Sequence, residues 1–225
     1  MTTKALYLTD MCLLNCSAQV VKVTVEGERS TVILDQTVFH PQGGGQPSDK
    51  GTMKNKEIIF DVQNVSKEDG VVFHNGVFTS GQGLKEGDAV ELEVEPELRK
   101  LHCRNHTAGH IIDYAMINLG YTLEPSKAYH YPQGPYVEYI GTLEQEERDA
   151  LVQKLEREAN KLVAEGLPVR VEFTDNDPKK RSMIAGDYRP IPCGGTHVIN
   201  TADIGHITIR KIKNEKGNLR VSYAV

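Results

Sequence analysis

Two short segments of this sequence carry side chains that commonly bind metal ions. Their spacings are H-x3-H, at His106 and His110, and C-x3-H, at Cys193 and His197. Histidines four residues apart lie one above the other on one face of a helix, so both rings can reach the same ion. Imidazole and thiolate groups together are a typical ligand set for Zn²⁺. The two segments therefore indicate a zinc-dependent hydrolase.

The sequence around each segment predicts how it is presented. Residues 97–120 follow Pro96, end at a glycine and carry apolar side chains at three- and four-residue spacing, which predicts a helix beneath the two histidines. Residues 192–197 contain one proline and two glycines, which predicts a tight loop. Gly109 costs about 1 kcal/mol relative to alanine inside a helix. We expect it to leave room for the metal or for a closely packed neighbour.

Three familiar classes of zinc protein do not fit these spacings. Zinc proteases carry H-E-x-x-H, but Thr107 stands where the glutamate should be. Nucleobase deaminases carry H-x-E followed by P-C-x-x-C, and both the glutamate and the second cysteine are missing. The sequence has no C-x2-C pair for a zinc finger, and Cys12 and Cys16 are more simply explained as two partly buried thiols. His102, one turn before His106, is a further histidine on the same helix face.

The rest of the chain divides into a β-rich part and a mixed part, which we place at 1–95 and 96–225. The first has short β-branched or alternating runs at 20–25, 30–34, 57–62, 71–74 and 89–94, which predict a small barrel or sandwich. The second has strands at 136–140, 168–173, 204–212 and 219–223, the last two joined by a longer loop, and a second helix that starts at a capping box in 142–145 and stops at Gly166. Because strands and helices do not alternate regularly, we expect an α+β fold with an antiparallel sheet.

A glycine-rich stretch at 39–49 contains Gly43, Gly44 and Gly45, followed by Gln46. Consecutive glycines permit positive φ angles and let a backbone approach another group closely. A flexible loop and a substrate-facing loop both account for it.

Composition excludes several classes of function. A hydrophobic content of 39% and a charged content of 25% are typical of a soluble globular protein. No apolar run reaches membrane-spanning length, and Asp10 interrupts any signal-peptide core, so we expect a cytoplasmic protein without a membrane partner. The net charge of −5 argues against general nucleic-acid coating but allows one basic face. Candidates for that face are Lys179, Lys180, Arg181, Arg210, Lys211 and Lys213, for which plain solubility is an equal explanation.

The two metal-binding segments resemble those of the editing domain of alanyl-tRNA synthetase and of the free-standing AlaX proteins, in their medium-length form. The stretch 39–49 resembles the signature of the small β-barrel that precedes that editing domain. The resemblance covers nearly the whole chain in the same order and leaves no room upstream for an aminoacylation domain. It implies an N-terminal small β-barrel followed by an α+β editing domain, whose antiparallel sheet packs against helices. The family usually has a larger residue where Gly109 stands, which puts helix rigidity or pocket volume in question.

The resemblance implies a trans-editing deacylase that cleaves the aminoacyl ester of Ser-tRNA(Ala), and of Gly-tRNA(Ala). It implies one Zn²⁺ per chain, held by the ligands His106, His110, Cys193 and His197. A catalytic zinc keeps one open position, whereas four protein ligands close the site. We therefore expect one loose ligand and predict His197, because it follows a Gly-Gly-Thr loop.

The resemblance also implies roles around the metal. Gln46 would orient the substrate or a water, and the backbone of Gly43, Gly44 and Gly45 would line the pocket for the seryl side chain. Thr107 would bind the substrate, although its hydroxyl could instead bond its own helix. Lys179, Lys180 and Arg181 would contact tRNA, and a monomer is the preferred oligomeric state. The alternatives are a zinc-stabilised module that binds tRNA or a partner without chemistry, and an unrelated small-molecule metallohydrolase. The position of the glycine-rich stretch argues against both.

Overall fold

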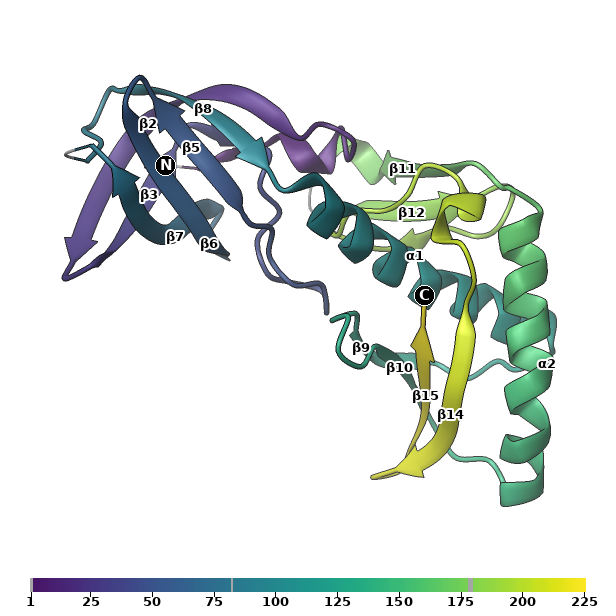
Figure 1. Ribbon diagram of the computed structural model, residues 1–225. Coiled ribbons are helices and arrows are strands. Elements are labelled where there is room, and N and C mark those ends of the chain that lie inside the picture. Colours follow the sequence, from purple (N-terminus) through teal and green to yellow (C-terminus); the bar gives the residue numbers. More distant parts are fainter. Residues whose placement is uncertain (1, 82, 178–179) are drawn as a thin grey trace. The chain divides into compact units, whose positions relative to one another are not determined.

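The computed structural model describes residues 2–81, 83–177 and 180–225, and the chain forms two compact units (Figure 1). The first unit comprises Met1–Gly43 and Pro47–Lys100, and the second comprises Gly44–Gln46 and Leu101–Val225. Three residues of the glycine-rich stretch thus belong with the chain that carries the predicted metal ligands. The domain limits 1–95 and 96–225 stay a prediction from sequence.

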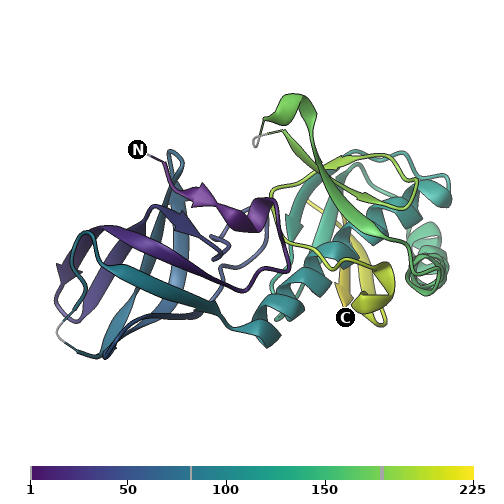
Figure 2. The ribbon, with the colours of Figure 1, turned by 90° about the horizontal axis from the view of Figure 1, so that it is seen from above.

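The first unit is a closed antiparallel barrel of six strands, as the sequence predicts (Figure 2). The strands, in order around the barrel, are β2 (Asn15–Glu26), β3 (Arg29–Leu34), β7 (Val71–Ser80), β6 (Ile58–Glu68), β5 (Gly51–Asn55) and β8 (Ala89–Val94). Outside it, β1 (Lys4–Ala5) pairs in parallel with β4 (Gln36–Thr37), with the 3₁₀ turn η1 (Leu6–Leu8) following β1. The alternation of β8 is typical: Val90, Leu92 and Val94 are buried, whereas their neighbours are not. Strand β5 escaped sequence analysis because only Met53 in it is buried.

A buried ion pair anchors the chain on either side of the glycine-rich stretch within the first unit. The carboxylate of Asp49 is fully buried and accepts hydrogen bonds from Arg99, which also donates to the Val38 carbonyl at 2.7 Å. The same carboxylate accepts from the backbone N–H of His40. Because buried charges are stable only when paired and hydrogen-bonded, these contacts fix where the stretch leaves and re-enters this unit.

His74 makes the stability of the barrel depend on pH. Its Nδ1 donates to the Val32 carbonyl at 3.0 Å and its Nε2 lies 2.8 Å from the Thr37 hydroxyl. Burial lowers the pKa of His74 from 6.5 to about 4, with the bond to Val32 opposing. The folded protein therefore binds fewer protons than the unfolded chain. The contribution is complete above pH 6.5 and is lost as the pH falls towards 4, by about 3 kcal/mol in total.

Urea unfolding between pH 7 and pH 4 tests this. The wild type should lose about 3 kcal/mol more than a His74→Gln variant over this range, whereas the exposed-site variant His206→Gln should follow the wild type. Equal pH dependence of wild type and His74→Gln would contradict the prediction.

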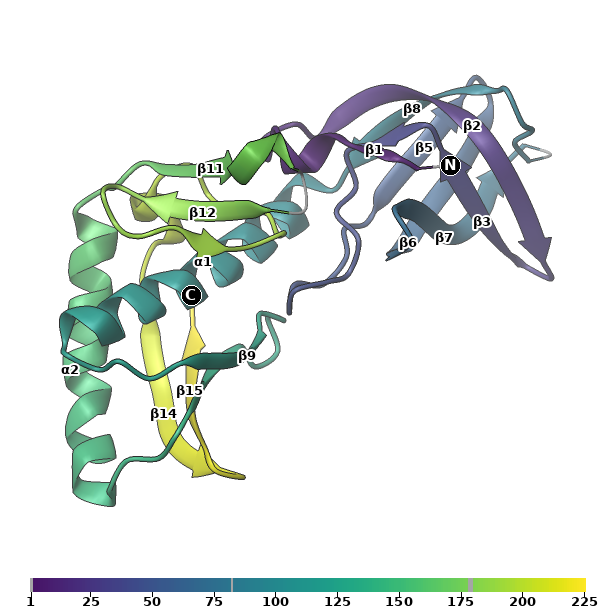
Figure 3. The same ribbon diagram turned by 180° about the vertical axis from the view of Figure 1, so that it is seen from behind.

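The second unit combines two helices with two antiparallel sheets (Figure 3). The helices are α1 (Pro96–Asn118), whose first turn belongs to the first unit, and α2 (Gln145–Ala164). One sheet has the order β14 (Thr208–Glu215), β15 (Asn218–Ala224), β10 (Tyr136–Ile140) and β9 (Pro125–Tyr129). The other has the order β11 (Val169–Phe173), β12 (Arg181–Ala185) and β13 (Ile191–Pro192). The 3₁₀ turns are η2 (Thr174–Asn176) and η3 (Thr201–Ile204). The predicted α+β class with an antiparallel sheet is confirmed.

One apolar cluster joins these elements. The helices contribute Ala108, Ile111, Ile112, Ala115, Leu151, Leu155 and Ala159, and the larger sheet contributes Val137, Tyr139, Leu219, Val221 and Tyr223. These apolar residues of α1 lie on the side of the helix opposite to His106 and His110, so α1 is buried on both sides. Among the described residues, neither helix has the length and apolarity needed to cross a membrane.

Two local predictions were wrong. Helix α2 is preceded by Glu144 as N-cap without a side-chain capping bond, so the proposed capping box at 142–145 does not form. The last hairpin has a two-residue turn, not a longer loop, because Glu215 pairs directly with Asn218. Lys216 and Gly217 both have positive φ, which matches the twist of a tight hairpin. Strands β9, β12 and β13 lie outside the strand segments predicted from the sequence.

Candidate metal centre

Helix α1 presents the first two ligand candidates from successive turns. His106 and His110 are both buried, and their rings stack with centroids 5.2 Å apart. This follows from the helical repeat, which places residues i and i+4 on the same face. The other side of the helix, with Ile111 and Ala115, lies in the apolar core, and this packing holds the helix that carries the rings.

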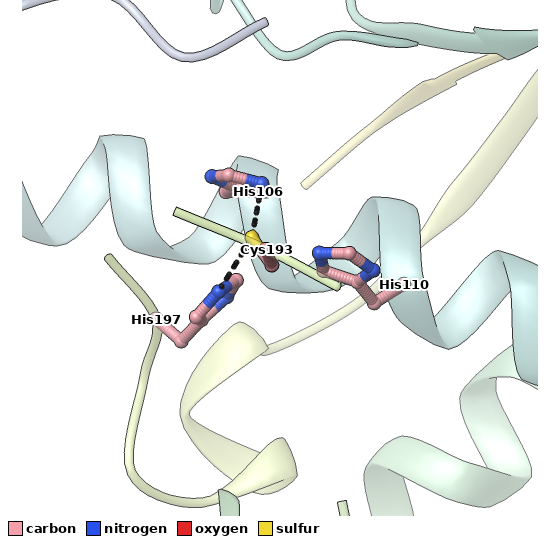
Figure 4. A group of neighbouring side chains, drawn as sticks. All are labelled: His106, His110, Cys193 and His197. Atoms are coloured by element: carbon pink, nitrogen blue, oxygen red, sulfur yellow. Dashed lines mark hydrogen bonds between the residues drawn. The ribbon is translucent and has the colours of Figure 1, made fainter. Parts of the chain in front are cut away.

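The loop after β13 supplies the other two candidates. The Sγ atom of Cys193 lies 3.3 Å from Nε2 of His106 and 3.2 Å from Nε2 of His197 (Figure 4). The loop is clamped by Arg181, whose guanidinium donates to the carbonyls of Cys193 and Gly195, both at 2.8 Å. The predicted tight loop is therefore fixed by a buried cation that binds its backbone.

The four side chains fit a single metal ion. One ligand atom from each of His106, His110, Cys193 and His197 can be chosen so that all lie within 4.8 Å of one another. Neither ring nitrogen of His110 has a hydrogen-bond partner among the described residues, although both are buried. A buried nitrogen without a partner is costly, and coordination of a cation would satisfy it. The grouping predicted from the sequence is present in the structure.

The charges of the group also suit a cation. Burial raises the pKa of the Cys193 thiol, but His106, His197 and His110 outweigh it and hold the pKa well below its ordinary value. Burial lowers the pKa of His197 to about 3, although Cys193 opposes it. Burial also disfavours protonation of His110, yet Cys193 and Asp113 raise its pKa to about 10. A soft or borderline divalent metal binds a thiolate together with neutral imidazoles, so metal binding would displace the proton that His110 holds.

Gln46 fixes the ring of His106. Its Oε1 accepts from Nδ1 of His106 at 2.6 Å and from the backbone N–H of Thr196 at 3.0 Å, while its Nε2 donates to the Thr196 hydroxyl at 2.8 Å. Because the proton of His106 sits on Nδ1, its Nε2 is left with the lone pair that faces Cys193. Such outer contacts orient metal-binding histidines and raise their basicity.

Replacing Gln46 with leucine should therefore weaken metal binding about 10- to 100-fold, the usual effect of losing an outer hydrogen bond to a ligand. Competition with a chromogenic chelator measures the affinity. Gln42→Leu, in the same stretch but exposed, is the matched control and should bind metal as the wild type does. Unchanged affinity in Gln46→Leu would contradict this role.

Thr107 has a comparable relation to His197. Its buried hydroxyl donates to the Cys103 carbonyl at 2.8 Å, accepts from the backbone N–H of Val198 at 3.2 Å and lies 3.3 Å from Nδ1 of His197. With its own proton engaged, the hydroxyl can accept the Nδ1 proton of His197. Nε2 of His197 then faces Cys193. Thr107 therefore bonds the backbone of its own helix and also orients the ring of His197.

The predicted tRNA-contacting residues lie in different settings. Arg181 is only 3% exposed and binds the ligand loop, so a surface contact with tRNA is wrong for this residue. Lys180 is exposed and forms a 2.7 Å ion pair with Asp175. Lys179 lies outside the described residues. The basic run therefore divides between a structural role and the surface.

The glycine triplet approaches strand β9 at its third member. Gly44 and Gly45 have φ angles of +57° and +79°, which glycine adopts without strain. A side chain at Gly45 would lie 2.5 Å from the Ala128 carbonyl, and the Gly45 carbonyl accepts from the backbone N–H of His130 at 2.8 Å. Gly43 and Gly44 are exposed. The lining of a seryl pocket stays a prediction.

Sequence analysis missed His130, which follows β9. Its ring stacks on that of His106, with centroids 4.3 Å apart, and its Nδ1 lies 2.7 Å from the Tyr223 hydroxyl. A side chain on Gly109 would come within 2.5 Å of Cε1 of His130, so the glycine makes room for this ring. Burial is the main reason that its pKa lies well below the ordinary value. A glycine in the helix interior was the one available signal, since it called for a close neighbour.

Two family models match this chain, one in each of the two units. Residues 5–98 match the family model described as "tRNA synthetases class II (A)", and residues 183–222 match "Threonyl and Alanyl tRNA synthetase second additional domain". The first range contains the glycine-rich stretch and the second contains Cys193 and His197, whereas the helix with His106 and His110 lies between them.

Several relatives align with most of this chain. The chain is 30% identical to the alanyl-tRNA editing protein AlaX-L of Pyrococcus horikoshii, over 95% of this chain but 55% of that protein. It is 31% identical to the alanine–tRNA ligase of Bacillus pumilus, over 89% of this chain and 24% of the ligase. The chain thus spans about half or less of these two relatives. It is 31% identical to the alanyl-tRNA editing protein AlaX-M of Pyrococcus horikoshii, over 94% of this chain and 91% of AlaX-M. The chain belongs to the alanyl-tRNA editing protein family.

Membership of this editing-protein family confirms the resemblance inferred from the two metal-binding segments. The family assignment concerns the whole chain, since the AlaX-M match covers both the barrel and the second unit. The histidine–cysteine group lies in the unit whose C-terminal part matches the alanyl and threonyl tRNA synthetase domain.

Proposed function

We propose that this protein is a deacylase that hydrolyses the aminoacyl ester of Ser-tRNA(Ala), and of Gly-tRNA(Ala), in trans. The observation that carries the proposal is the convergence of four metal-binding side chains, all buried or partly buried, in a chain of the alanyl-tRNA editing family. The spacing of these side chains excludes the protease and deaminase classes, which need a glutamate that the sequence does not place there.

We propose Zn²⁺ as the metal, one per chain, bound by His106, His110, Cys193 and His197. Mixed thiolate and imidazole ligands favour zinc over hard cations. When bound, the ion supplies a Lewis acid that polarises the ester carbonyl or activates a water. The role of the surrounding residues is to hold the ligands, through Gln46 for His106 and Thr107 for His197.

An open coordination position requires one ligand that is held less firmly than the others. The sequence pointed to His197, but its Nδ1 lies 3.3 Å from Thr107 and its Nε2 lies 3.2 Å from Cys193. His110 has no hydrogen-bond partner among the described residues, and its Nδ1 is 3.7 Å from Asp113. We therefore favour His110 over His197 as the exchangeable ligand.

We propose that exposed cations of the second unit bind the acceptor stem. Lys180, Arg210 and Lys211 are exposed and are candidates for this contact, whereas Arg181 is buried and is not. With a net charge of −5, phosphate contacts have to be local, and tRNA affinity should fall steeply with added salt.

Deacylation assays on three charged forms of tRNA(Ala) test the function. Ser-tRNA(Ala) and Gly-tRNA(Ala) should be hydrolysed, and Ala-tRNA(Ala) should be largely spared. Removing the metal with a chelator should abolish hydrolysis, and added Zn²⁺ should restore it. Equal rates on the three esters would refute the editing role. Binding of tRNA without hydrolysis, lost on chelation, would instead support a zinc-stabilised binding module.

A further inference from the structure

We propose that His130 recognises the hydroxyl group of the seryl substrate and thereby separates serine from alanine. The inference rests on the deacylase function proposed above and names a specificity residue for it. Neither metal-binding segment includes His130, and its ring nitrogens are not among the four converging ligand atoms. Three features of the second unit support this role for His130: a fixed tautomer, an acceptor nitrogen without a hydrogen-bond partner, and two glycines beside that nitrogen.

The tautomer is set by a chain of two hydrogen bonds. The Tyr223 hydroxyl donates its single proton to the Asn105 carbonyl at 2.8 Å. The same hydroxyl lies 2.7 Å from Nδ1 of His130, so its oxygen must accept a proton from that nitrogen. A neutral imidazole carries one proton, and with that proton on Nδ1 the Nε2 atom is a bare acceptor. The Tyr223 hydroxyl, which already donates to Asn105, thus determines that Nε2 of His130 is the nitrogen that can accept a hydrogen bond.

The available nitrogen has no partner within the part of the chain that the structure describes. His130 is only 2% exposed, yet its one side-chain hydrogen bond is the one made by Nδ1. Nε2 is nevertheless not among the fully enclosed side-chain atoms that lack a partner, so this nitrogen borders space that water or a ligand can reach. A donor brought by the substrate would satisfy this acceptor.

Two glycines flank the acceptor. Nε2 lies between Cε1 and Cδ2 in the imidazole ring. A side chain on Gly109 would come within 2.5 Å of Cε1, and one on Gly45 within 3.2 Å of Cδ2. The ring face is stacked on the metal-ligand candidate His106. The edge with the unpaired nitrogen is therefore bordered by backbone from two segments and lies beside the metal centre, where the ester must bind.

A hydroxyl donor explains selection better than pocket size does. Alanine differs from serine by one missing hydroxyl, and it fits wherever serine fits. A site that hydrogen-bonds the hydroxyl favours serine over alanine, because alanine brings no donor for the acceptor. Glycine also lacks the hydroxyl, but it has no methyl group and leaves room for a water that donates to Nε2. His130 should therefore affect the seryl substrate and leave glycyl binding unchanged.

Binding of three non-hydrolysable probes tests the proposal without relying on catalysis. The probes are 3′-deoxyadenosine derivatives with seryl, alanyl or glycyl groups attached through a 3′-amide, titrated by calorimetry. The wild type should bind the seryl probe more tightly than the alanyl probe. His130→Asn keeps a donor for Tyr223 but removes the acceptor, and it should weaken seryl binding about 10- to 100-fold. Alanyl and glycyl binding should stay as in the wild type.

Two further variants keep the test decisive if the asparagine disturbs the ring stack. His130→Gln places an amide oxygen near the former Nε2 and should restore part of the seryl preference. His206→Asn, at an exposed histidine, should match the wild type on all probes. Zinc content is measured for each variant.

The proposal is overturned if His130→Asn keeps the seryl preference, or if it weakens all three probes equally or loses zinc while His130→Gln restores nothing. Failure of the deacylase function is a separate result. A wild type that prefers the seryl probe but does not hydrolyse Ser-tRNA(Ala) would refute catalysis and leave recognition by His130 standing.

Discussion

Replacing Cys193 with alanine should reduce the metal content of the purified protein from about one ion per chain to near zero. It should also lower the rate of Ser-tRNA(Ala) deacylation by at least ~100-fold, more than loss of an outer contact does. The reason is that Cys193 is the only anionic member of the group, and its Sγ lies within 3.3 Å of the Nε2 atoms of His106 and His197. Removing the thiolate leaves three neutral imidazoles to hold a divalent cation.

Elemental analysis and single-turnover deacylation measure the two effects. Cys12→Ala, an exposed cysteine of the first unit, is the control and should retain both metal and activity. A His106→Ala/Cys193→Ala double variant makes the test stringent. If that variant keeps a full complement of zinc, the ligand assignment is wrong.

Replacing Gly195 with alanine should have an effect of similar size without touching a ligand. A side chain at this position would come within 2.1 Å of Cε1 of His106 and 2.6 Å of Oε1 of Gln46. Such distances are far below contact, so either the ring of His106 or the loop must move. Overpacking of this kind costs about 1–3 kcal/mol in stability. Displacing the ring also breaks the outer contact to Gln46, so we expect zinc affinity to fall by at least ~10-fold.

The neighbouring glycine provides a closely matched control. A side chain on Gly194 would meet nothing within 4 Å, and this residue has no positive φ. Gly194→Ala should therefore bind zinc and hydrolyse Ser-tRNA(Ala) as the wild type does, while Gly195→Ala fails in both. Equal behaviour of the two variants would show that the loop is loose enough to absorb the added methyl group.

The sequence determined the parts of this protein that depend on local spacing. The four-residue interval between His106 and His110 needs only a helix to bring both rings to one face. The alternation in residues 89–94 needs only a strand to bury Val90, Leu92 and Val94. Both patterns repeat within a few residues, so they could be recognised before the fold was known. The pair of histidines and the alternating strands came from patterns of this kind, whereas the choice of a barrel over a sandwich came from the resemblance to the editing family.

Only the tertiary structure decided which residues surround the metal-ligand candidates. Gln46 meets Thr196 across 150 positions of sequence, and His130 meets Tyr223 across 93. Arg181 shows the same limit, because a short basic run predicts a surface, whereas packing buried its guanidinium against the carbonyls of the ligand loop. Spacing along the chain fixes the geometry within one helix or strand. The contacts between segments are set by how those elements pack, and single residues carry no periodic signal of such contacts.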